Sequence, residues 1–135
     1  MKNVIHLTIG VLLAALVLVF ATKPAVAQDP AKVASNVYKM LLENDRVRVL
    51  EVRAKPGEKI PMHSHPPYVV YSLSSAKVKF VTPDTTMIVE LKAGEVSWRE
   101  AEKHAPENIG TTEVHVLVIE LKEPHKALKK MTPMK

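Results

Sequence analysis

The sequence predicts an all-β domain, an antiparallel sandwich or barrel, on the basis of three observations. From Arg46 onward, short runs rich in β-branched residues alternate with turns marked by proline or glycine. No segment combines a phosphate-cradling glycine loop with a βα unit, and only three of the four glycines lie beyond residue 27. The length of 135 residues fits one domain preceded by an apolar leader. Several short strands of this kind are typical of antiparallel architectures.

Residues 1–27 have the pattern of a secretory signal peptide. Lys2 precedes an apolar run over 4–20, and Ala-Val-Ala at 25–27 offers small residues where a signal peptidase cleaves. The alternative is an uncleaved anchor, because an apolar run of about 17 residues is at the short end of what spans a bilayer. Pro24 and the Ala-x-Ala site favour cleavage. We therefore expect a periplasmic or secreted protein with no stable membrane anchor after cleavage.

Composition excludes several kinds of site and partner. The chain has no cysteine, which excludes disulfides, iron–sulfur clusters, thiolate zinc sites and cysteine nucleophiles. Any metal must therefore be held by histidine, carboxylate or amide ligands. Removal of residues 1–27 takes away two lysines and no acid, leaving 17 basic and 14 acidic residues and a net charge of +3. This charge is too mild to indicate a nucleic-acid partner.

The chain after the leader divides into an arm, a body and a tail. The arm, residues 28–45, is compatible with a helix over 31–42 or with an extended segment, and the sequence leaves both open. The body, residues 46–122, carries the expected strands at 46–54, 68–73, 76–82, 85–91 and 113–121. The basic tail, residues 123–135, is expected to be solvated or to contact anionic lipid headgroups.

The third and fourth strands are predicted to pair as a hairpin. Ala76, Val78 and Phe80 alternate with two lysines, so we expect the apolar residues to face inward. The run ends at Pro83-Asp84, and residues 85–91 follow as the partner strand.

A short internal repeat (the echo) precedes the histidines that could bind a metal. Lys55-Pro56-Gly57-Glu58 and Lys92-Ala93-Gly94-Glu95 are near-copies, and histidine follows each at short range. On a strand, His63 and His65 would point to the same face, because they are two residues apart. If the two units pair, His104 approaches that face and completes a set of three imidazoles, which suits several transition metals. The alternative is chance similarity, with solvated loop histidines.

These residues resemble the two sequence motifs of the cupin superfamily. The spacing Gly57-x5-His63-x-His65 is similar to the start of the first motif, and Gly94 through His104-x3-Asn108 is similar to the second. The resemblance covers residues 50–120. It implies a single-domain jelly-roll β-barrel with one divalent metal ion, Fe, Mn, Cu, Ni or Zn. It also implies His63, His65 and His104 as the metal ligands.

The sequence departs from the first motif at its metal-binding glutamate. No carboxylate lies between Glu58 and Asp84, and Tyr68 falls where the family has that glutamate. Three neutral imidazoles leave the ion's charge uncompensated, so it should be a stronger Lewis acid with open positions for water, dioxygen or an anion. Tyr68 is the candidate catalytic residue, donating a hydrogen bond to a bound ligand. Its alternative role is packing on Pro66 and Pro67.

The second motif lacks its Pro-x-Gly, and Glu100-Ala101-Glu102 stands there instead. Either Glu100 or Glu102 could orient His104, with solvation as the alternative. Trp98 is expected in the core or on the cavity wall. His115 is expected to be a satisfied core or surface histidine rather than a fourth ligand.

Two functions follow from this interpretation. The first is an exported metal-binding cupin that acts as a dioxygenase-like enzyme on a small oxygen-rich or enolisable molecule. The second is a non-catalytic periplasmic module that binds a metal or a small ligand. A structural cupin with an apolar interior and no site is a third reading. A homodimer is expected by analogy, with the arm able to exchange across the interface.

Overall fold

The computed structural model describes residues 28–122, so the predicted signal peptide (1–27) and basic tail (123–135) lie outside the described residues. One short helix precedes nine strands in this part of the chain. The elements in chain order are α2 (Pro30–Val33), β1 (Tyr38–Glu43), β2 (Val47–Ala54), β3 (His63–His65), β4 (Tyr68–Ser72), β5 (Ala76–Val81), β6 (Thr86–Leu91), β7 (Val96–Arg99), β8 (Glu102–Asn108) and β9 (Val114–Leu121).

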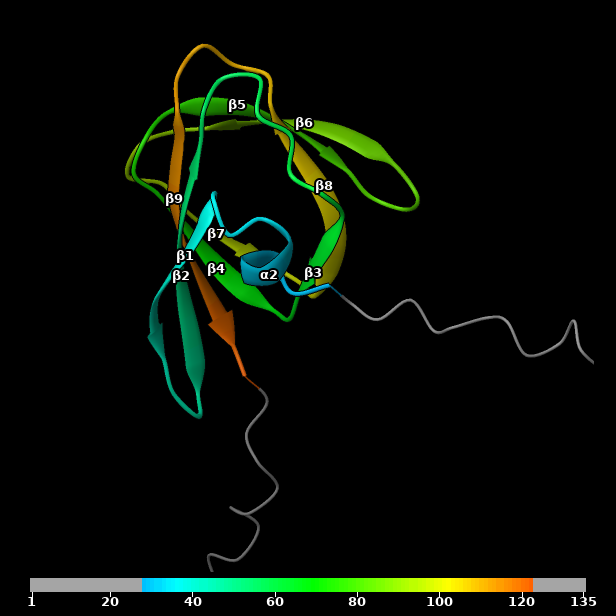
Figure 1. Cartoon of the computed structure of the whole chain (residues 1–135). Coiled ribbons are helices and arrows are strands. Elements are labelled where there is room, and N and C mark those ends of the chain that lie inside the picture. The colour runs from blue at the N-terminus through cyan, green and yellow to red at the C-terminus, as the bar shows by residue number, and fades with distance from the viewer. Residues whose placement is uncertain (1–27, 123–135) are drawn as a thin grey trace, which may run out of the picture.

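The strands form two antiparallel sheets that lie opposite each other (Figure 1). The five-stranded sheet has the order β1-β2-β9-β4-β7, and the four-stranded sheet has the order β3-β8-β5-β6. The all-β prediction is therefore confirmed. The backbone pairings recorded for residues 28–122 group the strands into two sheets rather than into one closed barrel, so a two-sheet sandwich describes the fold.

Five predicted strands are present as β2, β4, β5, β6 and β9, each within two residues of its expected ends. In the predicted hairpin of β5 and β6, Val78 is buried and pairs with Val89, while Lys77 is exposed. The sequence did not predict β7 or β8. Strand β8 carries Glu102, Lys103 and Pro106, which are poor strand formers, and its pairing with β3 and β5 keeps it extended.

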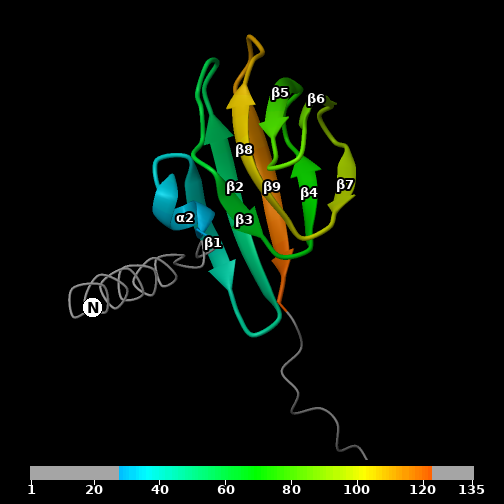
Figure 2. The ribbon, with the colours of Figure 1, turned by 90° about the vertical axis from the view of Figure 1, so that its right-hand side faces the viewer.

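The arm contains both of the conformations that its sequence allowed. Asp29 caps α2 by accepting a hydrogen bond from the backbone N–H of Ala31 at 3.0 Å, and Pro30 occupies the first turn. Strand β1 then pairs antiparallel with β2, with an irregularity between Met40 and Leu42. In Figure 2, α2 and β1 lie against the edge of the domain beside β2 and β3. The arm is thus part of the sheet, while its boundary at residue 45 stays a prediction.

The two glycines of the echo take the same role in the fold. Gly57 and Gly94 have φ angles of 80° and 84°, a region that favours glycine. Each turn closes with a hydrogen bond between residues three apart, from Glu58 N to Lys55 O at 3.0 Å and from Glu95 N to Lys92 O at 3.1 Å. The echo therefore encodes two similar turns.

The core lies between the facing sheets. Alternate residues of β2 and β9, including Leu50, Val52, Val116 and Val118, are buried there. Full burial of such a side chain contributes about 1.5–3 kcal/mol. No helix in residues 28–122 is long and apolar enough to cross a membrane.

The polar residues buried with this core are His63, His65, Ser72, His104, Asn108 and Glu120. Because unpaired burial of polar groups is costly, the histidine cluster among them calls for a chemical explanation.

Candidate metal centre

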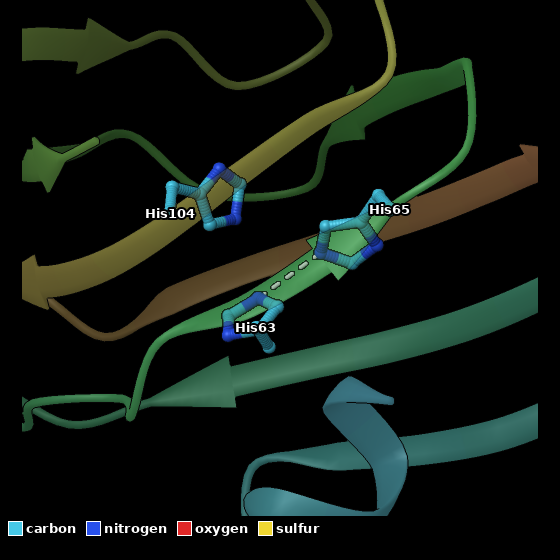
Figure 3. A group of neighbouring side chains, drawn as sticks. All are labelled: His63, His65 and His104. Atoms are coloured by element: carbon cyan, nitrogen blue, oxygen red, sulfur yellow. Dashed lines mark hydrogen bonds between the residues drawn. The ribbon is translucent and has the colours of Figure 1, made fainter. Parts of the chain in front are cut away.

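Three buried histidines meet on two paired strands (Figure 3). His63 and His65 lie on β3, and His104 lies on β8 directly opposite His63. The potential ligand atoms of the three residues lie within 4.8 Å of one another. The expected convergence of histidines from separate parts of the sequence is thus present, because β3 and β8 are neighbours in one sheet.

Hydrogen bonds on the far side of two rings determine which nitrogen can bind a cation. His63 Nδ1 donates to the carbonyl of Pro61 at 2.7 Å, and His65 Nδ1 donates to Glu120 Oε1 at 2.6 Å. In two neutral rings the Nε2 atoms are then both acceptors, and they face each other at 3.1 Å. Two lone pairs at this distance repel unless a proton or a metal ion lies between them.

The spacing of the two Nε2 atoms fits a shared ion. Nitrogens that each bind one ion at about 2.1 Å, at angles between right and tetrahedral, lie about 3.0–3.4 Å apart. The observed separation of 3.1 Å falls in this range. The chemistry and spacing of these two donors therefore fit a divalent transition metal, and His104, whose ligand atom lies within 4.8 Å of theirs, is the candidate third ligand.

Glu120 supports the site from the other sheet, and the sequence interpretation missed it. Its side chain on β9 accepts from His65 and also from Arg48 Nε at 2.6 Å, and Arg48 Nη1 bonds Asp29 at 3.0 Å. Burial alone would raise the pKa of Glu120, but the hydrogen bonds from His65 and Arg48 bring it below its ordinary value. A carboxylate is therefore present behind His65. The signal for it was an acid in the inward register that follows Val116 and Val118.

Glu102 lies beside the third histidine. Its Oε1 is 3.2 Å from His104 Nδ1, but the geometry does not make a hydrogen bond, and that buried nitrogen has no partner among the described residues. We take the pair as an electrostatic contact. Glu100 instead accepts from Trp98 Nε1 at 2.7 Å on the surface. Of the two acids that the sequence offered for His104, Glu102 is thus the one within reach.

Burial keeps His63 and His104 uncharged in the absence of an ion. It lowers the pKa of His63 to about 4, against the opposing hydrogen bond to Pro61. The pKa of His104 is also lowered by burial and by the neighbouring imidazoles. Neutral imidazole is the form that binds a metal.

Two tyrosines flank the histidines. The ring of Tyr68 lies 4.8 Å from that of His65, and its hydroxyl donates to Glu102. Tyr68 thus lies beside the cluster with its hydroxyl bonded to Glu102, and its catalytic role stays a prediction. Tyr38, which the sequence interpretation did not single out, places its hydroxyl 3.0 Å from His63 Nε2. No local pattern marks Tyr38, because only the pairing of β1 with β2 brings it to the site.

A cavity of about 90 Å³ adjoins the histidines between the sheets. His65, His104 and both tyrosines line one part, and Arg99 lies over the Phe80 ring at 5.4 Å from its centroid. Most of the remaining wall is apolar, including Val52, Val70, Val78, Leu91, Val116 and Val118. The interior is therefore not filled by apolar side chains. The interpretation as a structural cupin without a site required a filled interior, so the cavity argues against it. Its volume suits a ligand of few heavy atoms, since drug-sized pockets are about 300–1,000 Å³.

Two weaker candidates lie away from the site. Trp98 is 50% exposed and pairs with Val69 on the outer face of the five-stranded sheet, so both roles expected of it were wrong. The reason is the register of β7, in which Ser97 and Arg99 face the cavity instead. His115 is half-buried and its Nε2 lies 2.9 Å from Glu51 Oε1, which agrees with a satisfied histidine.

Comparisons with known proteins agree with the fold. No protein-family model and no curated protein matches the sequence. Among solved structures, a cupin domain from Bordetella pertussis Tohama I is 29% identical, with a TM-score of 0.61, over 64% of this chain and 93% of that one.

Two other similar structures share the fold. A conserved protein with a double-stranded β-helix domain from Klebsiella pneumoniae is 22% identical, with a TM-score of 0.52, over 66% of this chain and 79% of that one. The polyketide cyclase RemF from Streptomyces resistomycificus is 23% identical, with a TM-score of 0.51, over 64% of each chain. These similarities show that the chain has the cupin fold, and the similarity to the Bordetella cupin domain supports membership of the cupin superfamily.

Proposed function

We propose that this protein is an exported cupin that binds one divalent metal ion through His63, His65 and His104. The observation that carries the proposal is the 3.1 Å approach of two Nε2 atoms whose rings have already used their Nδ1 protons. Glu120 stabilises the positive charge through His65 without occupying a position on the ion. Export rests on the signal-peptide pattern of residues 1–27.

We further propose dioxygenase-like chemistry on a small oxygen-rich or enolisable molecule. A bound redox-active ion would supply Lewis acidity and dioxygen activation. The protein supplies a small cavity with largely apolar walls, which excludes bulk water from the reacting molecule. Arg99 gives the cavity one cationic side chain, which suits an enolate or carboxylate oxygen.

The second candidate is a non-catalytic module that binds a metal or a small ligand. The small cavity volume favours it, because about 90 Å³ leaves little space for a substrate beside an ion. The two candidates share the metal centre and differ in whether the ion is redox-active and whether dioxygen is consumed.

Metal analysis of the protein purified from an exported fraction tests the shared centre. We expect one ion per chain in wild type, loss of the ion in His104→Ala, and retention in the matched control His115→Ala on the outer face. Circular dichroism should show that both variants remain folded. Retention of the ion by folded His104→Ala would remove the ligand assignment.

Oxygen uptake separates the two candidates. Iron, copper or manganese in the purified protein, with dioxygen consumed when a small 1,3-diketone is added, supports the enzyme. Zinc alone, with no uptake by iron-loaded protein across small enolisable compounds, supports the binding module.

A further inference from the structure

The hydroxyl of Tyr38 points at the same nitrogen that the metal would use. Tyr38 begins β1, is 6% exposed, and places its hydroxyl 3.0 Å from His63 Nε2. His63 Nδ1 is already engaged with the Pro61 carbonyl, so its Nε2 has one lone pair to offer. The phenol and an ion therefore compete for that lone pair.

Binding of an ion deprives this buried hydroxyl of its acceptor. Among the described residues, His63 is the one hydrogen-bond partner of the Tyr38 side chain. A buried hydroxyl left without a partner is unfavourable, so it should find a new acceptor close by. The nearest group that arrives together with the ion is the water, anion or substrate oxygen bound at its open position.

The other tyrosine is less suited to this task. Tyr68 also lies beside the cluster, but its hydroxyl donates to Glu102, which also lies within 3.4 Å of Arg99 Nε. That hydroxyl keeps its acceptor whether or not an ion is bound at the histidines.

The arm holds Tyr38 in place. The backbone N–H groups of Val37 and Tyr38 both donate to the carbonyl of Ala34 at 2.9 Å, and Tyr38 pairs with Val52 of β2. The preceding helix is tied to the body by the 3.0 Å ion pair of Asp29 with Arg48. A donor fixed by packing and backbone hydrogen bonds is pre-organised for a ligand.

We propose that Tyr38, rather than Tyr68, donates a hydrogen bond to the small oxygen- or nitrogen-containing ligand bound at the metal. This inference rests on the proposed metal centre. It assigns a residue outside both cupin motifs to the recognition of anionic or oxygen-bearing ligands.

Azide binding to the cobalt(II)-loaded protein tests the proposal. Wild type and Tyr38→Phe should each bind one cobalt per chain, but the Kd for azide, followed by visible absorption, should rise about 10–100-fold in Tyr38→Phe. Tyr71→Phe, on the outer face, is the matched control and should bind azide as wild type does. The asymmetric stretch of bound azide should also shift in Tyr38→Phe and not in Tyr71→Phe.

Several outcomes would overturn the inference. Wild-type azide affinity in cobalt-loaded Tyr38→Phe would show that the hydroxyl donates nothing to the ligand. Loss of cobalt from folded Tyr38→Phe would make the phenol oxygen a metal ligand instead. Weakened azide binding in Tyr68→Phe alone would assign the donor to Tyr68. Wild-type protein that binds no cobalt or other divalent ion would remove the metal centre itself.

Discussion

At the scale of the residue, the Glu120 carboxylate beside His65 supplies part of the negative charge that is missing because the first motif lacks its glutamate. The family's glutamate would compensate charge at the ion, whereas Glu120 reaches the far nitrogen of an imidazole from another strand. Such a carboxylate determines the tautomer of the ring and raises its basicity as a ligand. The ion should therefore be bound firmly and still keep its open positions.

Substitution of Glu120 should weaken metal binding. In Glu120→Gln the negative charge behind His65 is lost while the shape is kept, so we expect metal affinity to fall about 10–100-fold. Competitive titration of zinc or cobalt against a chelator measures the change. Glu51→Gln is the matched control, because Glu51 lies beside His115 on the outer face in a similar pairing. Equal affinities in Glu120→Gln and wild type would contradict the role of this carboxylate.

The depressed pKa of His63 predicts how pH changes the stability of the metal-free protein. Between the unfolded pKa of 6.5 and the folded value of about 4, the unfolded chain binds more protons. The free energy of unfolding should therefore fall as pH decreases through this window, by on the order of 3 kcal/mol for this group. Urea unfolding at pH 7, 5.5 and 4.5 measures the slope, and His63→Gln should reduce it, leaving the part that belongs to His104. A constant free energy over this range would show that His63 is not held neutral by burial.

At the scale of the element, α2 and β1 complete the site. Asp29 caps α2 and also pairs with Arg48, which in turn bonds Glu120. The first turn of the arm is thus connected through two side chains to the carboxylate behind His65. Strand β1 contributes Tyr38 on the other side of the cluster.

Removal of the Asp29 side chain should loosen the arm. Asp29→Ala loses both the N-cap and the ion pair, so we expect about 1–2 kcal/mol lower stability. Thermal unfolding measures the loss, and Asp45→Ala, an exposed acid in the turn after β1, is the control. If the two variants melt at the same temperature, the arm is not held by Asp29.

At the scale of the whole molecule, the outer face of the five-stranded sheet carries a row of apolar residues. The strand register aligns one apolar residue from each strand into a continuous row, Leu42, Val49, Ile119, Val69 and Trp98. Leu42 and Trp98, at the two ends of the row, are 47% and 50% exposed, and contiguous exposed apolar residues are typical of interaction surfaces. On the same strand as Val49, Arg53 is paired with Glu51 and Glu113.

We expect a homodimer formed through this face. Trp98→Glu would bury a charge at the interface and should shift the protein to a monomer in light scattering coupled to size exclusion. Ile88→Glu replaces a 58% exposed apolar residue on the other sheet and should leave the dimer unchanged. A wild-type protein that is monomeric at high concentration would contradict the prediction.

The all-β class, five of the nine strands in residues 28–122 and the three histidines could be predicted from the sequence, because alternation, turn residues and spacing are local properties. The sequence also allowed Tyr68 to be placed near the cluster. The groups that surround the histidines could not be predicted in this way. Glu120 meets His65 across 55 residues of sequence, and Tyr38 meets His63 across 25. These contacts depend on how β1 and β9 join the sheet that faces β3. Such strand order arises from long-range pairing, which no local pattern encodes.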